Sequence, residues 1–136
     1  MLQTTYFKTM TYFSDRQPEV AGVLFALRHD ESLITDFVPD TSGRGTSVSF
    51  ELDAANLNRL LKEKKALGLT CTGIIHSHPG GITQPSFGDL HYFRTLFAAP
   101  ANGAASHLFV PIVCDGRLYP FAFANNDVHS ACLTLV

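Results

Sequence analysis

The segment "EVAGVLFALR" (19–28) constrains the fold most strongly, because its middle is an uninterrupted apolar run with several β-prone residues. A strand that is buried on one face alternates apolar and polar residues, whereas a continuous apolar strand is typical of burial on both faces. We therefore expect this segment to be a central strand of a sheet that is covered on both sides.

Other β-prone segments are bounded by turn-forming residues, and we predict strands over 2–13, 33–39, 46–52, 69–78 and 127–136. The first of these is one strand or two joined strands, and the last is an edge strand. An Asp-Gly dipeptide at 115–116 lies between the apolar segments 106–114 and 117–123, which predicts a β-hairpin.

Two helices are expected. The first follows Asp53, which is a good N-cap, and ends before Gly68, a natural C-terminal cap. Four leucines mark its apolar face: Leu57, Leu60, Leu61 and Leu67. The second helix begins near Ser86 and runs to about Ala99, before Pro100. The fold class is α+β (mixed α/β): a central, partly antiparallel sheet with about two helices packed on it.

The 136 residues are expected to form a single domain spanning 1–136. Charged residues make up only 16% and the net charge is −2, so nucleic acid is not an expected partner. No apolar run approaches the roughly 20 residues of a membrane helix, and the N-terminus lacks a signal peptide pattern, so we expect a cytoplasmic protein. Three widely spaced cysteines (Cys71, Cys114 and Cys132) are expected to be buried or half-buried free thiols.

The stretch "GIIHSHPGGITQPSFGDL" (73–90) contains the candidate metal ligands. His76 and His78 are two residues apart at the end of a predicted strand, so both imidazoles project to one side. The Pro-Gly-Gly that follows forces a sharp turn, which could return Asp89 to them as a third ligand. Alternatively, "SFGD" has the spacing of a capping box, in which Ser86 and Asp89 only begin a helix. These two interpretations compete for the Asp89 carboxylate.

A hydrolytic metal site also needs a proton acceptor, and Glu19 is the best candidate because it stands at the start of the apolar strand. Its local sequence alone favours an exposed residue at a strand start. Gly88 is poor helix material and suggests a close approach of backbone or ligand. His91 is interpreted as an ordinary helix position rather than a support for the ligands.

"HSHPGGITQPSFGD" resembles the JAMM motif (also called the MPN+ or JAB motif), which is His-x-His, ten residues, then Asp, with a serine three residues before the aspartate. "PEVAGVL" (18–24) resembles the upstream segment of the same family, a proline, a glutamate and a glycine followed by apolar residues. The resemblance implies a mostly antiparallel JAB/MPN-like sheet with a cytidine-deaminase-like architecture. It departs from the family before Glu19, where a helix is usual but 2–13 is predicted to be strand.

Carried over by position, the resemblance implies one Zn²⁺ per chain, bound by His76, His78 and Asp89. Glu19 would be the general base for a metal-bound water, and Ser86 would hydrogen-bond the oxyanion. Nucleobase deaminases and HExxH proteases are excluded, since neither motif is present.

Members of this family cleave isopeptide or peptide bonds after the C-terminal glycine of ubiquitin-like proteins. The short chain is similar to the prokaryotic stand-alone type, whose partners are ubiquitin-like proteins or their conjugates and the activating or conjugating enzymes. The loop 40–47 is expected to border the zinc cleft, and a homodimer is possible because related domains often pair. Alternatives are a sulfur-carrier-protein peptidase with the same chemistry and a non-catalytic, zinc-stabilised MPN binding module.

Overall fold

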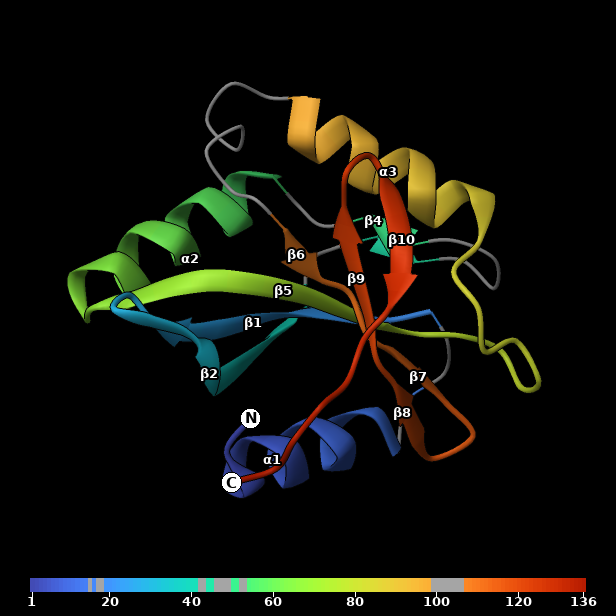
Figure 1. The fold of residues 1–136 in the computed structure, drawn as a ribbon, viewed down its shortest axis with the longest axis horizontal. Coiled ribbons are helices and arrows are strands. Elements are labelled where there is room, and N and C mark those ends of the chain that lie inside the picture. Colours follow the sequence, from blue (N-terminus) through green and yellow to red (C-terminus); the bar gives the residue numbers. More distant parts are fainter. Residues whose placement is uncertain (15, 17–18, 42–43, 46–49, 52–53, 99–106) are drawn as a thin grey trace.

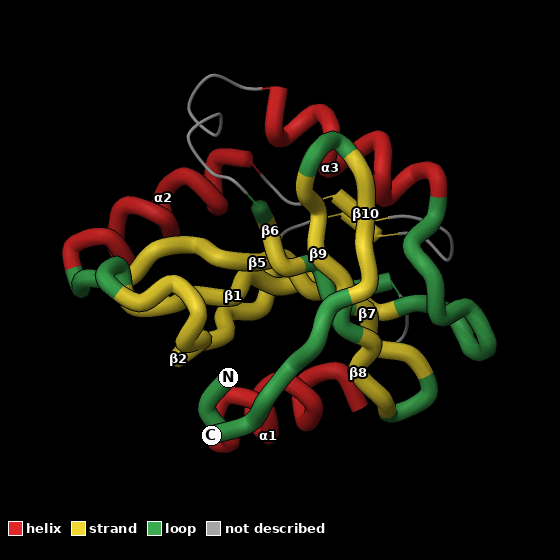
Figure 2. Tube along the Cα trace, viewed as in Figure 1, coloured by secondary structure: helices red, strands yellow, loops and turns green. Residues whose placement is uncertain are grey.

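The computed structural model describes residues 1–14, 16, 19–41, 44–45, 50–51, 54–98 and 107–136. Its centre is an eight-stranded, mostly antiparallel sheet in which neighbouring strands follow the order β10-β9-β6-β5-β1-β2, with β7 and β8 branching from β5. Helices lie on both faces of this sheet (Figures 1 and 2). The predicted α+β class is therefore confirmed.

Strand β1 (Ala21–Leu27) lies in the middle of the sheet and is buried along almost its whole length, as its apolar run predicts. It pairs antiparallel with both β2 (Asp30–Asp40) and β5 (Leu69–Ser77). Gly22 is required here, because a Cβ at this position would lie 2.3 Å from the Phe37 ring on β2.

The C-terminal strands extend the sheet on the other side of β5. They are β6 (Leu108–Phe109), β7 (Ile112–Cys114), β8 (Arg117–Tyr119), β9 (Phe121–Ala124) and β10 (Asp127–Ser130). Strands β6 and β7 run parallel to β5. Asp115 and Gly116 both have positive φ between β7 and β8, which confirms the predicted hairpin and is typical of a type I′ turn. The edge strand predicted at 127–136 is confirmed for its first four residues.

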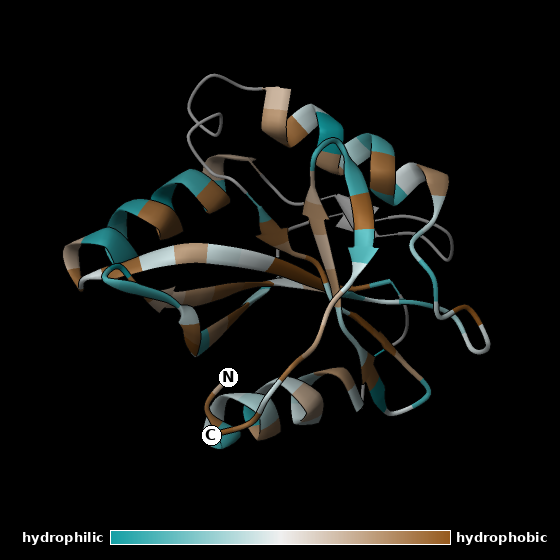
Figure 3. Ribbon diagram, in the orientation of Figure 1, coloured by the Kyte–Doolittle hydropathy of each residue, from teal (hydrophilic) through white to brown (hydrophobic). Residues whose placement is uncertain are grey.

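Helices α2 (Ala54–Ala66) and α3 (Phe87–Ala98) cover one face of the sheet, and both were predicted. Their apolar side chains pack on a core that contains Phe25, Ile74 and Phe93. Figure 3 shows hydrophobic residues along the central strands and on the helix faces directed toward them. Leu67 was wrongly placed on the apolar face of the first helix: α2 ends at Ala66 and the Leu67 side chain is exposed.

The other face of the sheet is covered by α1 (Gln3–Ser14), where a strand was predicted. That prediction is wrong. Thr5, Thr9 and Phe13 recur every four residues and form the buried side of this helix, and the Thr9 hydroxyl donates a hydrogen bond to the Thr5 carbonyl. Burial against β2 therefore outweighs the β-propensity of the threonines and aromatic residues.

An ion-pair cluster joins α1, β2 and α2. Lys8 and Lys64 each contact the Asp36 carboxylate, with N–O distances of 3.1 and 2.6 Å. Burial would raise the pKa of Asp36, but the hydrogen bonds from the two lysines outweigh it and hold the pKa below its usual value.

The described part of the chain also bears on the remaining sequence predictions. Strands β3 (Arg44–Gly45) and β4 (Phe50–Glu51) form a separate antiparallel pair. Strand β4 lies within the strand predicted at 46–52, and the other residues of that predicted strand lie outside the described ones. The N-cap predicted at Asp53 also lies outside them. All three cysteines are free, but Cys132 is exposed, contrary to prediction. No described helix has both the length and the apolar character needed to cross a membrane.

Candidate metal centre

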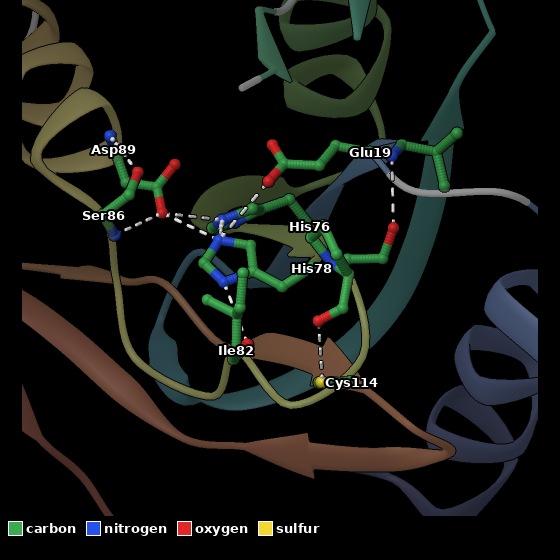
Figure 4. Close-up of polar contacts among 10 residues, drawn as sticks. Glu19, His76, His78, Ile82, Ser86, Asp89 and Cys114 are labelled. Carbon is green, nitrogen blue, oxygen red and sulfur yellow. Dashed lines mark hydrogen bonds and ion pairs between the residues drawn. The ribbon is translucent and has the colours of Figure 1, made fainter. Parts of the chain in front are cut away.

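The end of β5 and the start of α3 bring three donor atoms to one point (Figure 4). His76 and His78 project to the same side, with their Nε2 atoms 2.8 Å apart. Asp89 Oδ2 lies 3.1 Å from His76 Nε2 and 2.9 Å from His78 Nε2. All three side chains are buried, so the His-x-His spacing and the return of Asp89 by the intervening turn are both observed.

Asp89 also belongs to a capping box at the start of α3. Its backbone N–H donates to Ser86 Oγ at 3.1 Å, and the Ser86 N–H donates to Asp89 Oδ2 at 2.9 Å. The two interpretations of Asp89 were expected to compete, but the same carboxylate oxygen serves the cap and faces both imidazoles. The helix start therefore fixes the position of the candidate ligand.

The protonation of His76 and Asp89 suits a cation. Burial lowers the pKa of His76, which favours the neutral imidazole that binds metals. Burial would raise the pKa of Asp89, but hydrogen bonds with the two histidines outweigh it and keep the pKa well below its usual value. Burial would also lower the pKa of His78, yet the contact with Asp89 outweighs it and raises the pKa. The cluster thus holds a carboxylate beside a neutral imidazole, His76, and a second imidazole, His78, whose protonated form the carboxylate stabilises.

The tautomer of His78 is set by the turn that follows it. His78 Nδ1 lies 3.1 Å from the Ile82 carbonyl oxygen, which can only accept a hydrogen bond, so Nδ1 carries the proton. In the neutral ring the lone pair is then on Nε2, the atom that faces Asp89. A second group that fixes the orientation of a ligating imidazole in this way is common at metal sites.

Glu19 lies beside this cluster, two residues before the start of β1 (Figure 4). Its side chain is buried, and Oε1 is 3.7 Å from His78 Nε2. Burial raises the pKa of Glu19 to about 7, an effect that the positive charge of His78 reduces and the negative charge of Asp89 increases. The exposed position that the local sequence favoured is therefore wrong. Glu19 Oε2 is buried without a hydrogen-bond partner among the described residues.

These residues fit a small divalent cation. Two imidazole nitrogens and one carboxylate oxygen are a common donor set for zinc, whose bonds to such atoms are about 2.0–2.2 Å long. Tetrahedral geometry with these bond lengths separates the donors by about 3.4 Å, which is close to the separations of 2.8–3.1 Å observed here. Glu19 Oε2, which has no hydrogen-bond partner among the described residues, can accept a hydrogen bond from a further ligand of the cation.

The sequence also matches the model of a known protein family. A family described as "Prokaryotic homologs of the JAB domain" matches residues 13–124. The chain belongs to this family. The match begins at the end of α1 and includes His76, His78 and Asp89 as well as Glu19 and Ser86.

A solved structure has a similar fold. The solution structure of protein DSY2949 from Desulfitobacterium hafniense is similar to this chain with a TM-score of 0.73. The two sequences are 16% identical, and the similarity covers 99% of this chain and 90% of that protein. No curated protein matches the sequence.

Two groups that support the candidate metal centre were not predicted from the sequence. The first is the Ile82 carbonyl, and the second is Ser77, whose Oγ accepts a hydrogen bond from the Val20 N–H at 3.2 Å. The Pro-Gly-Gly signal indicated a turn, but a backbone acceptor leaves no side-chain signature. His91 is exposed on α3, as an ordinary helix position would be. Gly88 has only the Ser86 hydroxyl near its missing Cβ, at 3.7 Å, so no close backbone approach explains it.

Proposed function

We propose that this JAB domain is a zinc-dependent isopeptidase or peptidase that hydrolyses the bond after the C-terminal glycine of a ubiquitin-like protein, either to release a conjugate or to process a precursor. The observation that carries this proposal is the buried Glu19 carboxylate beside the His-His-Asp cluster. A site that only bound a structural ion would have no use for a buried carboxyl group with one unpartnered oxygen at this position.

His76, His78 and Asp89 would hold one zinc ion per chain. Nitrogen donors favour zinc over magnesium or calcium, which prefer oxygen ligands. When bound, zinc supplies Lewis acidity, which lowers the pKa of a water and polarises a carbonyl. Three protein donors leave one position of a tetrahedral ion for that chemistry.

Glu19 would be the general base. Burial raises the pKa of this carboxyl group, which makes it a better proton acceptor than an exposed carboxylate. Oε2 would take the proton from the attacking water and deliver it to the leaving amine. Because the side chain is buried, bulk water does not compete for that proton.

Ser86 would stabilise the oxyanion. Its Oγ uses one lone pair to accept the Asp89 N–H, which leaves the hydroxyl hydrogen available for donation. No acceptor for this hydrogen is present among the described residues. A donor held by a helix start is preorganised, and removing a donor of this kind typically slows kcat about 10²–10³-fold.

The burial of the centre supports a glycine beside the scissile bond. His76, His78, Asp89 and Glu19 are each at most 6% exposed, so a carbonyl group reaches them most easily on a slender chain without side chains. A pocket of about 470 Å³ adjoins Ser86 and is also lined by Phe87, Leu90 and Val128, which offers an apolar place for a neighbouring part of the substrate. An extended tail could also pair with a strand edge. The expected role of the loop 40–47 stays a prediction, because half of its residues lie outside the described ones.

The test compares Glu19→Gln with Glu31→Gln, an exposed position on β2. Both variants should retain about one zinc per chain, but only Glu19→Gln should abolish cleavage of ubiquitin-like proteins that carry a C-terminal fluorogenic amide. Phenanthroline should stop the wild-type reaction, whereas a thiol reagent should not. Wild-type cleavage by Glu19→Gln would refute the assignment of the base, and zinc retention by the His76→Ala, His78→Ala double variant would refute the metal site.

The same experiments address the alternatives. A sulfur-carrier-protein peptidase would share every residue requirement and differ in the tail that it accepts, so a panel of tails distinguishes the two. A non-catalytic zinc-stabilised module would bind zinc and cleave none of them. Cytoplasmic location, a homodimer and association with activating or conjugating enzymes stay predictions. Neighbouring genes for a ubiquitin-like protein and an activating enzyme would point to deconjugation or tail processing.

A further inference from the structure

The turn after the histidine pair is tied to the β7–β8 hairpin. Pro79 to Ile82 form a β-turn, closed by the Ile82 N–H donating to the Pro79 carbonyl at 3.1 Å, with Gly81 at φ +82°. A positive φ at the third residue is typical of a type II turn. The Gly81 N–H donates to Asp115 Oδ2 at 3.1 Å, across 34 positions in sequence.

Two further contacts show that the hairpin and this turn are fitted to each other. The Cys114 thiol lies 3.4 Å from the Pro79 carbonyl oxygen, to which it can donate. A Cβ on Gly80 would lie 3.2 Å from Asp115 Oδ1, so glycine at this position permits the carboxylate to approach. The Pro-Gly-Gly sequence is thus explained by the neighbouring hairpin as well as by the turn itself.

These contacts connect Asp115 to the candidate metal ligand His78 through two residues of the turn. Asp115 holds Gly81, and the adjacent residue Ile82 presents the carbonyl that fixes the His78 Nδ1 proton. Asp115 is exposed and has a φ of +52°, so its side chain is not needed for the core. We propose that Asp115 is a positioning residue for the metal centre, which acts through the turn 79–82 on the orientation and tautomer of His78.

This inference rests on the metal site of the proposed function but not on its proteolytic activity. Its expected effect is on metal affinity, where loss of an outer partner of a ligating histidine typically costs 10–100-fold. Because Asp115 acts on His78 only through Gly81 and Ile82, we expect the lower end, about 10-fold.

The chain offers a matched control for this test. Asp115→Gly removes the carboxylate, and glycine tolerates the positive φ. Asn125, with a φ of +53° in the β9–β10 turn, is a corresponding hairpin position. Asn125→Gly should change thermal stability about as much as Asp115→Gly but leave zinc affinity unchanged. Asp115→Asn keeps an oxygen acceptor for the Gly81 N–H and also tolerates positive φ, so it should bind zinc within about twofold of wild type.

Two measurements decide the outcome. Zinc dissociation constants come from competition with a chromogenic chelator, and ¹⁵N NMR of the histidine rings in metal-free protein at pH 9 reports the His78 tautomer. Asp115→Gly should weaken zinc binding and reduce the Nδ1–H form. The proposal is overturned if Asp115→Gly changes neither quantity, or if Asp115→Asn weakens binding as much as Asp115→Gly, since charge would then be the cause. If wild type binds no zinc, the proposed function fails and the tautomer measurement alone decides.

Discussion

Substitutions of Ser86 can test whether its hydroxyl group only caps α3 or also stabilises the oxyanion. They leave the candidate ligand Asp89 in place, because the backbone of Ser86 holds it. Ser86 Oγ caps α3 by accepting the Asp89 N–H, while the Ser86 backbone N–H holds Asp89 Oδ2. Neither Ser86→Ala nor Ser86→Gly removes the backbone N–H. Both variants should therefore retain the ligand geometry and bind zinc like wild type.

The two substitutions differ in their effect on stability. Loss of a serine N-cap to alanine typically costs about 1 kcal/mol, whereas glycine at the same position costs only a few tenths. Both remove the hydroxyl donor completely. If the hydroxyl stabilises the oxyanion, both should lower kcat about 10²–10³-fold, equivalent to about 3–4 kcal/mol in the barrier, with little change in KM.

The assay measures kcat and KM on a fluorogenic ubiquitin-like substrate, zinc content and urea unfolding for each variant. Ser86→Thr serves as the control, because it retains a hydroxyl group and a cap. The expected result is that kcat falls equally in the alanine and glycine variants although only the alanine variant is clearly destabilised. If the glycine variant keeps kcat within about threefold of wild type, the hydroxyl is only a helix cap.

Three further predictions test the fold around the site. Gly73→Ala should destabilise the protein by about 2 kcal/mol or more in urea unfolding, because its Cβ would lie 2.5 Å from the Phe109 carbonyl oxygen. The depressed pKa of Asp36 gives stability that is present above its unfolded pKa and lost as pH falls, so between pH 7 and pH 3 wild type should lose about 1 kcal/mol more than Asp36→Asn. At pH 8 iodoacetamide should label exposed Cys132 first, as shown by mass spectrometry, because burial raises the pKa of Cys71 to about 11.

The parts of the fold that the sequence predicted are those in which a local pattern and the tertiary environment agree. The apolar run of β1 requires burial on both faces, and Asp115–Gly116 suits the positive φ values of a two-residue turn. Segment α1 was missed because its threonines and aromatic residues prefer strands when judged singly. The four-residue recurrence of Thr5, Thr9 and Phe13 was the available signal for a helix.

The candidate site divides in a similar way. Spacing and resemblance suggested the three ligands, Ser86 and Glu19, since each contributes a side chain to a recognisable pattern. The Ile82 carbonyl and the Asp115 carboxylate could not be predicted, because one is a backbone group and the other depends on how a distant hairpin lies against the turn. Positions of this kind follow from three-dimensional packing and not from local sequence.

The register between β1 and β5 explains how two distant sequence segments form one site. Ala21 pairs with His76, and the ladder continues outward through the Ser77 N–H, which donates to the Val20 carbonyl at 3.0 Å. One further step in the same register places Glu19 opposite His78, in agreement with the 3.7 Å between Oε1 and Nε2. A slip of one residue would turn the Glu19 side chain to the other face of the sheet. The pairing of the two central strands, more than any loop, therefore brings the proposed base to the proposed metal ligands.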